Sequence, residues 1–517
     1  MQDQVHSSPT VGRLALRALR RHPDRAAFVS ETGSMTYRET ADTIGRFQAV
    51  LTAQGLRRGA CVAILSGNRP ETWCATIAAQ ALGMRTTPLH PMGSVDDHRF
   101  QLDDSGADAI VVDPVAYQAR GGELAGDVGT ALTFGPADFG LDLVAAGEAH
   151  GAATAVADDH LDDIAIINYT GGTTGRPKGA MRRHPSSVAS TIAILADFEL
   201  PDRPRYLAAA PISHVAGSKI MPVLLRGGSV HLMSGFDPQK FAARVAAEQI
   251  NMTLAVPTMV YALLDQPDDV VRQLDPLELL LYGASPMSPS RLEEGLARIG
   301  PVFSQLYGQT ECYPVAVLPR ADHDPARPEL FSACGYPVAS CEVELLDDDG
   351  QPVPDGEAGE ICVRGPHTMG EYWKRPEQTA EAFAGGWLHT SDIARRDETG
   401  RLFIVDRKKD MIISGGFNVY PKEVEDVLSS HPAVAMVAVI GVPDPKWGEA
   451  VTAFIVARPG AAATEDELIA LVKRSKGGPH TPKHVEFVES LPLTAVGKID
   501  KKVLREPYWS DTGRQVG

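Results

Sequence analysis

The chain has 517 residues, of which 44% are hydrophobic and 22% charged, the composition of a globular protein with a large core. At roughly 150 residues per domain, this length predicts three or four structural units. The formal net charge is −17, since 66 acidic residues outnumber 49 basic ones. This balance argues against non-specific nucleic-acid binding and against a polybasic membrane anchor.

The cysteines and the N-terminus indicate the cellular setting. The six cysteines form no C-x-x-C pair and have no metal-ligand spacing, so we expect small buried side chains in a reducing compartment. They are Cys61, Cys74, Cys312, Cys334, Cys341 and Cys362. Residues 1–10 lack the apolar stretch of a signal peptide, and the longest apolar run, residues 433–442, is too short to span a bilayer. We therefore expect a cytoplasmic protein without integral membrane association.

Strands and helices are predicted to alternate over the first third of the chain. The predicted elements are a helix at 11–21, a strand at 26–30, a helix at 35–54, a strand at 61–65, a helix at 73–82, and strands at 85–89 and 109–112. This alternation favours a doubly wound parallel sheet and an α/β fold. Residues 120–160, rich in Gly, Ala and Asp, are predicted to be surface connections.

The stretch Tyr169-Thr-Gly-Gly-Thr-Thr-Gly-Arg-Pro-Lys-Gly-Ala180 is the strongest chemical signal. It follows a short apolar run, residues 164–167, that reads as a buried strand. Its glycines let backbone N–H groups approach an anion, its threonines add hydroxyl donors, and Lys178 adds a positive charge. The order differs from a Walker loop, because Pro177 precedes the lysine. We interpret it as a polyphosphate-binding loop; the alternative is an ordinary surface loop.

A second motif, Gln305-Leu-Tyr-Gly-Gln-Thr-Glu311, suits a nucleotide. Tyr307 can stack on a flat base, Thr310 can donate to the α-phosphate, and Glu311 is a hard oxygen ligand suited to Mg²⁺. Taken alone, the alternative is a helix cap.

Together these motifs resemble those of the adenylate-forming superfamily, which includes acyl-CoA synthetases, luciferase-like enzymes and the adenylation domains of peptide synthetases. The resemblance extends over roughly residues 36–505, with several motifs in the same order. One departure is Gly171, where the family usually has Ser. The resemblance implies an ATP-dependent ligase that converts a carboxylic acid into an acyl adenylate with release of pyrophosphate and then transfers the acyl group to coenzyme A.

Site residues follow from the same resemblance. It implies that the nucleotide is bound by Thr170, Gly171, Gly172, Thr173, Thr174, Gly175, Lys178, Gly283, Ala284, Ser285, Tyr307, Gly308, Thr310, Asp392, Arg407 and Lys498. The implied catalytic residues are Lys498, Thr310, Glu311 and Lys178, with Glu311 as the Mg²⁺ ligand. Asp392 matches the family's ribose-binding carboxylate, and Ser391 replaces a common Gly. On its own, Lys498 could be a solvated lysine of the tail.

The acyl pocket is implied by segments that follow two strands. The residues expected to line it are His214, Val215, Tyr282, Gly283, Ala284, Ser285, Gln309, Cys312 and Tyr313. Without the resemblance, a lone histidine such as His214 would be taken as packed or exposed. Residues 212–217 contain no Asp to hold an amino group, so an α-amino acid is disfavoured. The apolar character of the set suits a fatty, aromatic or steroid-derived acid.

The last third of the chain is predicted to contain a small antiparallel β-barrel, starting near residue 334, and then a second domain. We expect an AMP-binding adenylation domain at 1–406 and a mobile, smaller α+β domain at 407–517, with a hinge near 406–410. The alternative for the charged run at 406–410 is a solvated turn. In the family, Lys409 would be the pivot, and Ser414, Gly415 and Gly416 would line the coenzyme A channel.

Two other functions remain open from the residues. A fatty acyl-AMP ligase would deliver its acyl group to a carrier protein, but residues 400–415 contain no extra segment of the kind those enzymes carry. A non-catalytic nucleotide-binding protein is the other alternative. The expected partners are a small carboxylic acid, ATP and coenzyme A, with no nucleic acid; a homodimer is compatible with the sequence.

Overall fold

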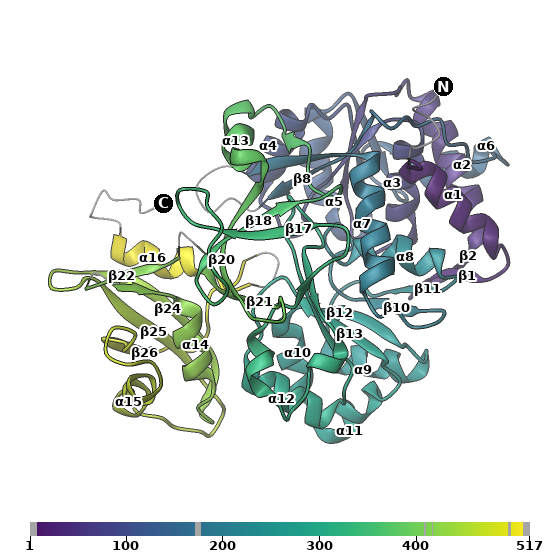
Figure 1. Ribbon diagram of the computed structural model, residues 1–517. Helices are drawn as coiled ribbons and strands as arrows, with labels where there is room; N and C mark the ends of the chain where they lie inside the picture. The colour runs from purple at the N-terminus through teal and green to yellow at the C-terminus, as the bar shows by residue number, and fades with distance from the viewer. Residues whose placement is uncertain (1–7, 171–176, 408–409, 416, 495–497, 510–517) are drawn as a thin grey trace.

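The computed structural model describes residues 8–170, 177–407, 410–415, 417–494 and 498–509. Figure 1 shows a large body, coloured from purple to green, and a smaller green-to-yellow body formed by the C-terminal part of the chain. Several residues of the predicted site lie outside the described residues: Gly171, Gly172, Thr173, Thr174 and Gly175 of the phosphate loop, Lys409 of the hinge and Gly416 of the coenzyme A channel. The side chain of Arg407 is likewise outside the description.

An eight-stranded sheet carries the ends of the phosphate loop. Its strand order is β19-β9-β8-β4-β3-β5-β6-β7. The strands are β3 (Cys61–Leu65), β4 (Arg85–Pro88), β5 (Ala109–Val112), β6 (Thr130–Thr133), β7 (Leu141–Asp142), β8 (Ile164–Thr170), β9 (Lys178–Arg183) and β19 (Glu371–Tyr372). Strands β3 to β8 are parallel, whereas β8 and β9 form an antiparallel pair in which Thr170 lies opposite Lys178. The predicted loop therefore joins two strands of one hairpin.

A nine-stranded sheet stands beside the first, in the order β16-β15-β14-β13-β12-β10-β11-β1-β2. Its strands are β1 (Ala26–Ser30), β2 (Gly33–Thr36), β10 (Arg205–Ala208), β11 (Ser229–Leu232), β12 (Met252–Ala255), β13 (Leu279–Gly283), β14 (Phe303–Tyr307), β15 (Ala316–Leu318) and β16 (Tyr336–Pro337). Its central strands are parallel, so the prediction of doubly wound α/β sheets is confirmed.

A layer of helices is shared by the two sheets. It contains α1 (Val11–Arg21), α2 (Tyr37–Ala53), α3 (Pro70–Ala81), α7 (His184–Asp197) and α8 (Ile220–Leu225). Alternate residues of one strand enter different clusters: Leu279 and Leu281 of β13 face this inner layer, whereas Leu280 and Tyr282 face outward. There they meet α9 (Pro238–Ala247), α10 (Pro257–Leu264) and α12 (Pro289–Arg298). Period-two alternation thus fills a separate core on each face.

Residues 120–160 are more ordered than their composition predicts. They contain the end of α5 (Pro114–Leu124), then β6, β7 and α6 (Leu143–His150). The prediction of surface connections is therefore wrong for this segment. Its strands are short and carry few large apolar residues, but β6 pairs with the fully buried β5 and so completes the sheet. Pairing partners, which sequence composition does not reveal, stabilise these strands.

The predicted small barrel is an open sheet. Its strands β17 (Glu342–Leu346), β18 (Gly359–Arg364), β20 (Leu388–Arg396) and β21 (Leu402–Arg407) are antiparallel in the order β17-β18-β20-β21. Among the strands that the structure describes, the outer two do not pair with each other, so nothing closes a barrel. The short strands and turns were predicted correctly, but closure depends on strand tilt and stagger.

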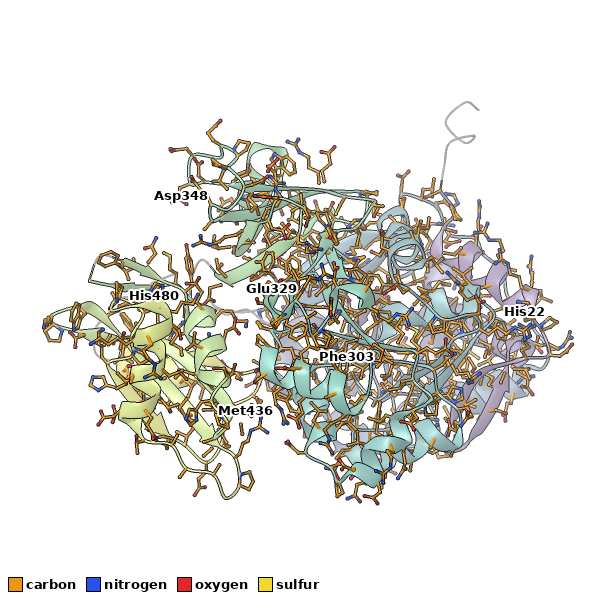
Figure 2. The ribbon with its side chains drawn as sticks, turned by 60° about the horizontal axis from the view of Figure 1, so that its bottom comes forward. His22, Phe303, Glu329, Asp348, Met436 and His480 are labelled. Carbon is orange, nitrogen blue, oxygen red and sulfur yellow. The ribbon has the colours of Figure 1, made fainter. Side chains whose placement is uncertain are left out.

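The smaller body is a five-stranded sheet with helices. Its elements are β22 (Ile412–Ser414), β23 (Phe417–Val419), α14 (Pro421–Ser429), β24 (Val434–Asp444), β25 (Gly448–Ala457), α15 (Glu465–Lys476), β26 (His484–Phe487) and α16 (Lys501–Trp509). It has its own apolar core, and Figure 2 shows it beside the large body, with Met436 and His480 labelled in the smaller body and Phe303 in the large one. The predicted α+β C-terminal part is confirmed.

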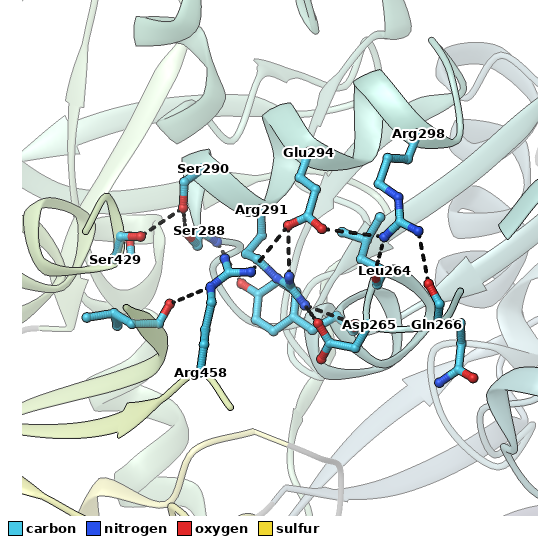
Figure 3. A network of polar contacts seen from close by, with 12 residues as sticks. Leu264, Asp265, Gln266, Ser288, Ser290, Arg291, Glu294, Arg298, Ser429 and Arg458 are labelled. Atoms are coloured by element: carbon cyan, nitrogen blue, oxygen red, sulfur yellow. Dashed lines mark hydrogen bonds and ion pairs between the residues drawn. The ribbon is translucent and has the colours of Figure 1, made fainter. Parts of the chain in front are cut away.

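The two bodies meet through few polar contacts. Ser290 at the start of α12 donates its hydroxyl to the carbonyl of Ser429, 2.8 Å away, and Arg458 lies 3.8 Å from Glu294 (Figure 3). Behind this contact, buried Arg291 bonds Glu294 and the carbonyl of Tyr261 and fixes α12 on the large body. A contact of this kind loses little free energy when it opens.

None of the helices in the described parts of the chain combines the length and the apolar character that crossing a bilayer requires.

Gly283 ends β13 where the strand passes β14. A Cβ atom built there would lie 2.3 Å from the carbonyl oxygen of Leu306. We expect Gly283→Ala to force β14 away and to reduce the free energy of unfolding by about 1–3 kcal/mol, the usual cost of overpacking. Denaturant unfolding would measure this loss. Gly235→Ala is the matched control, since no atom lies within 4 Å of its added methyl group; equal effects of both changes would contradict the packing argument.

Candidate active site

A buried carboxylate joins the nine-stranded sheet to the four-stranded sheet. Asp392 on β20 accepts hydrogen bonds from the Tyr307 hydroxyl at 2.7 Å and from the Gln309 amide at 2.6 Å. Burial, followed by the charge of Asp392, raises the pKa of Tyr307, so the phenol stays protonated and donates. Gln309 also donates to the Thr390 carbonyl at 2.8 Å. Gln309, which was predicted to line the acyl pocket, is thus bonded to the carboxylate that was predicted to bind ribose, and both roles stay predictions.

Ser391 occupies an unusual backbone conformation next to this carboxylate. Its φ is +60°, in the left-handed region that favours glycine. This agrees with the resemblance, in which Gly is common at the position. The backbone N–H of Ser391 donates to Glu360 at 2.8 Å, and the N–H of Asp392 donates to the Thr390 hydroxyl. These bonds hold the chain in the turn that presents Asp392.

A tyrosine that the sequence did not single out connects the predicted phosphate and metal residues. Tyr372 on β19 donates its hydroxyl to Glu311 at 2.7 Å, and the Lys178 ammonium lies 4.3 Å from the centre of its ring. Burial and the charge of Glu311 raise the pKa of Tyr372, which therefore remains a donor. One side chain thus holds a cation on one side and a carboxylate on the other. Its surroundings in the sequence, Glu371-Tyr-Trp-Lys374, contain no pattern that indicates this role.

Thr310 and Glu311 are held by backbone contacts from distant elements. The buried guanidinium of Arg182, on β9, donates to the Thr310 carbonyl at 2.6 Å. The Met369 N–H donates to the Glu311 carbonyl at 2.7 Å. Because β9 begins at Lys178, the strand that follows the phosphate loop also fixes the loop predicted to bind adenine and magnesium. Arg182 was also missed, since an arginine that follows the loop motif in a strand with other basic residues gives no separate functional signal.

This geometry brings predicted residues from three separate stretches of the chain into one region, and comparison with known proteins identifies the family. The family model described as AMP-binding enzyme matches residues 16–373, and the model described as AMP-binding enzyme C-terminal domain matches residues 423–498. This chain belongs to the AMP-binding enzyme family. The predicted superfamily and the predicted class of enzyme, an AMP-forming acid–thiol ligase, are both confirmed.

Relatives extend over nearly the whole chain. A medium/long-chain-fatty-acid–CoA ligase of Mycobacterium tuberculosis is 42% identical, over 99% of this chain and 92% of that protein. A feruloyl-CoA synthase of an Amycolatopsis species is 38% identical, over 96% of this chain and 99% of that protein. Among solved structures, an amide bond synthetase from Marinactinospora thermotolerans superposes with a TM-score of 0.88 at 34% identity, over 96% of this chain and all of that one.

At the acyl pocket predicted from the family, His214 packs against a second histidine. The rings of His214 and His90 meet edge to face, with centroids 4.3 Å apart. Burial lowers the pKa of His214 to about 3 and that of His90 to about 4, so both rings are neutral at pH 7. Ser213 lies 2.9 Å from the His214 Nδ1 atom. His90 follows β4 in the sequence and belongs to none of the motifs, so only the fold reveals that it pairs with His214.

Three other predicted pocket residues are enclosed by protein. Tyr282 faces the outer layer, where its hydroxyl lies 2.9 Å from His323, and Cys312 is fully buried. The pleat of β13 turns alternate side chains to opposite faces, which is why Tyr282 points away from the inner layer. Tyr313 is nearly buried, and its hydroxyl lies 2.5 Å from the Lys219 Nζ atom. The places of these three residues in an acyl pocket stay predictions.

Other residues of the predicted pocket lie at or near the ends of strands, and their ligand roles stay predictions. Gly283 and Ala284 follow at the carboxyl end of β13, and Ala284 has a φ of +67°. Ser285 and Ala284 are half-buried, as is Val215, whose carbonyl accepts bonds from Ser218 and Lys219. Gly308 lies against the Tyr313 ring. In open α/β sheets such strand ends are where ligands bind.

In the smaller body, Lys498 lies on a short antiparallel bridge between Leu493 and Ile499. The Thr494 N–H donates to the Lys498 carbonyl at 2.7 Å, and the Lys498 N–H donates to the Thr494 hydroxyl at 3.2 Å. In the predicted coenzyme A channel, Ser414 is buried and Gly415 has a φ of +59°. The Gly415 N–H donates to the Trp447 carbonyl at 2.7 Å. The roles of these residues stay predictions.

Replacing Tyr372 by Phe tests the contact between the two halves of the site. The variant keeps the ring beneath Lys178 but removes the bond to Glu311. We expect ATP–pyrophosphate exchange to slow by about 10- to 100-fold, since a hydrogen bond to a charged group is worth about 1.5–3 kcal/mol. Tyr508→Phe is the matched control, because it breaks a tyrosine–glutamate bond at the surface of the smaller body. An unchanged rate in Tyr372→Phe would contradict the proposed geometry.

The histidine pair predicts a pH dependence of stability. The folded pKa of His214 lies below its ordinary value of 6.5, so the unfolded chain binds more protons and stability falls as pH decreases from 6.5 towards 3. His214→Phe should remove up to one proton from this linkage, or about 1.4 kcal/mol per pH unit within that window. Urea unfolding between pH 4.5 and 7.5 would measure it. Parallel curves for the two proteins would show that the imidazole is not kept neutral.

Proposed function

We propose that this protein joins a fatty or aromatic carboxylic acid to coenzyme A in two steps, through an acyl adenylate. The observation that carries the proposal is the pair of contacts centred on residues 307–311: Tyr307 to the carboxylate of Asp392, and Glu311 through Tyr372 to Lys178. One short loop therefore connects a ribose-binding carboxylate, a metal-binding carboxylate and a phosphate-binding cation. The named relatives support acid–CoA ligation as the reaction.

The first step must overcome repulsion between two anions. The substrate carboxylate attacks the α-phosphate of ATP, and pyrophosphate leaves. Lys178, the loop N–H groups beside it and Lys498 would neutralise the charge that develops, while Asp392 would hold the ribose hydroxyls. Fixed charges aimed at the transition state lower such a barrier more than any other single factor.

Glu311 fits a magnesium ion. It is a carboxylate on a loop held by Met369 and Tyr372, and it is half-buried. Mg²⁺ is commonly bound by one or two carboxylates together with substrate phosphates. When bound, the ion would offset the charge of the outer phosphates. The Tyr372 bond would orient the carboxylate towards them.

The acid is proposed from the neutral surroundings of His214. The His90–His214 pair is uncharged at pH 7. Burial also holds the pKa of Lys219 well below its ordinary value, and its Nζ atom is bonded to Tyr313, Ser218 and the Val215 carbonyl. A pocket of this kind favours an apolar tail over a second carboxylate. The relatives that act on fatty acids and on feruloyl groups agree with such a tail.

The second step needs a movement of the smaller body. We place the adenylation domain at 1–406 and the C-terminal domain at 407–517, with the hinge at 406–410, which begins in the last two residues of β21. Asp406 accepts the N–H of Lys422 at 3.1 Å, which ties the hinge to α14. The small polar contact of Ser290 with Ser429 can break and reform at little cost. Rotation would exchange Lys498 for the Gly415 loop and bring in the thiol of coenzyme A.

A carrier-protein thiol or an amine could replace coenzyme A as the second acceptor. The similarity to an amide bond synthetase makes an amine a candidate acceptor, because that enzyme's name describes amide formation. Residues 400–415 contain no extra segment, which favours coenzyme A over a carrier protein. We also propose a cytoplasmic enzyme, where ATP and coenzyme A are available, and a homodimer that light scattering would test.

Lys498→Ala separates the two half-reactions. With acid and ATP, we expect the variant to form acyl-AMP at least about 100-fold more slowly, the effect of removing one transition-state donor. With supplied acyl-AMP and coenzyme A, it should still form thioester, because Lys498 would have withdrawn. Lys502→Ala, an exposed lysine four residues on, is the control.

The same assays decide between the acceptors. Pyrophosphate release from a panel of acids should be greatest with fatty or aromatic acids, and AMP release should then depend on coenzyme A. No pyrophosphate with any acid would overturn the proposed function. Thioester formation lost together with adenylation in Lys498→Ala would overturn the two-conformation mechanism.

A further inference from the structure

Three metal-ligating side chains from two neighbouring strands meet beside the ribose-binding strand. Glu360 and Cys362 lie two residues apart on β18 and so face the same side of the sheet. His389 on β20 is the direct cross-strand partner of Cys362. One potential ligand atom of each residue lies within 4.8 Å of the others. These three residues have no metal-ligand spacing along the chain, so the group becomes visible only in the folded structure.

The distances fit a small ion. The Cys362 Sγ atom lies 3.4 Å from the His389 Nδ1 atom, and the same nitrogen lies 3.2 Å from the Glu360 Oε2 atom. Around a tetrahedral zinc ion with bonds of about 2.0–2.3 Å, neighbouring ligand atoms are separated by roughly 3.3–3.6 Å. The distances from the His389 Nδ1 atom to the sulfur and to the carboxylate oxygen are therefore already close to those that a bound ion would require.

Surrounding hydrogen bonds orient two of the three ligands. The other ring nitrogen of His389, Nε2, lies 3.2 Å from the Ala384 carbonyl oxygen, which can only accept. The Glu360 oxygen beside Nδ1 can also only accept, so a neutral ring donates to one of the two oxygens; with the proton on Nε2, the Nδ1 lone pair is available to an ion. A histidine that donates its second N–H to a carbonyl is the usual arrangement in metal sites. The second oxygen of Glu360, Oε1, accepts the N–H of Ser391 at 2.8 Å.

Burial leaves one route to the group. Cys362 is fully buried, whereas 23% of the His389 side chain and 11% of the Glu360 side chain are exposed. An ion could therefore enter past the imidazole and keep a water molecule as its fourth ligand. Sulfur, imidazole and one carboxylate are a donor set that suits zinc and its neighbours, whereas Mg²⁺ prefers oxygen alone.

We propose that Glu360, Cys362 and His389 form a binding site for a divalent transition metal of the zinc type, separate from the nucleotide's magnesium site. The alternative is a hydrogen bond between a protonated His389 and Glu360, with the thiol packed beside it. In that case the group holds the two strands together and binds no ion.

The position of the site gives it a consequence for the nucleotide. His389 stands three residues before Asp392 on β20, and Glu360 holds the left-handed Ser391 between them. A metal that fixes Glu360 and His389 would fix the turn that presents the ribose-binding carboxylate. We therefore expect zinc to change the KM for ATP; this consequence rests on the proposed function, whereas metal binding itself does not.

Cobalt titration of the metal-depleted full-length protein tests the site. Co²⁺ is the probe, because it replaces zinc and shows a thiolate charge-transfer absorption. We expect one equivalent of Co²⁺ to bind with this absorption, zinc to displace it, and the melting temperature to rise as the site fills. Cys362→Ala should abolish the thiolate absorption, and His389→Gln should weaken binding by at least about 10-fold. Cys341→Ala, a half-buried cysteine elsewhere on the chain, is the control and should bind like the wild type.

The titration of the wild-type protein tests the proposed metal site even if a variant fails to fold. Absence of thiolate absorption in the wild type would overturn the proposal and favour the histidine–carboxylate bond. Survival of the absorption in folded Cys362→Ala would overturn the assignment to this cysteine. If the proposed ligase activity is absent while one cobalt ion binds with the thiolate signature, the metal site stands and the ligase proposal fails.

Discussion

The active-site region depends on a carboxylate that is buried where two sheets meet. Asp392 is only 5% exposed and comes from the four-stranded sheet, while its partners Tyr307 and Gln309 come from the end of the nine-stranded sheet. An unpaired charge at this depth would cost several kcal/mol, so the two donors are required as well as favourable. The hydrogen bonds that offset the cost of burying Asp392 also hold the two sheets together. They therefore fix the position of the loop that continues to Glu311.

A second bridge ties that loop to the remaining sheet. Tyr372 and Arg182 both belong to the eight-stranded sheet and contact residues 310 and 311. The three sheets of the large body thus converge on five consecutive residues, 307–311. Displacement of any one sheet would shift this loop and so change the adenine, magnesium and ribose contacts proposed for it. Protein interiors are packed too tightly for the neighbouring residues to compensate locally.

Local charge, and not net charge, suits this protein to an anionic cofactor. The chain carries a formal charge of −17, yet Lys178 and buried Arg182 lie at the site, and the loop between β8 and β9 adds glycines and threonines. Overall acidity disfavours non-specific binding of polyanions, while a few fixed cations act at short range, where solvent screens them least. The contact that the described residues of α12 make with the smaller body, a hydroxyl–carbonyl bond and a long ion pair, is weak.

The sequence by itself determined the family, the alternation of strands and helices, and the motif residues Lys178, Glu311 and Asp392. It could do so because these depend on local periodicity and on short runs of glycine, hydroxyl and charged residues. Only the tertiary structure decided that residues 120–160 complete a sheet, that the small sheet stays open, and that Tyr282 and Cys312 face protein. It alone revealed Tyr372, Arg182, His90 and the Glu360–Cys362–His389 group. Each of these depends on which strand lies next to which and which face a side chain takes, and such pairings between distant segments leave no periodic trace along the chain.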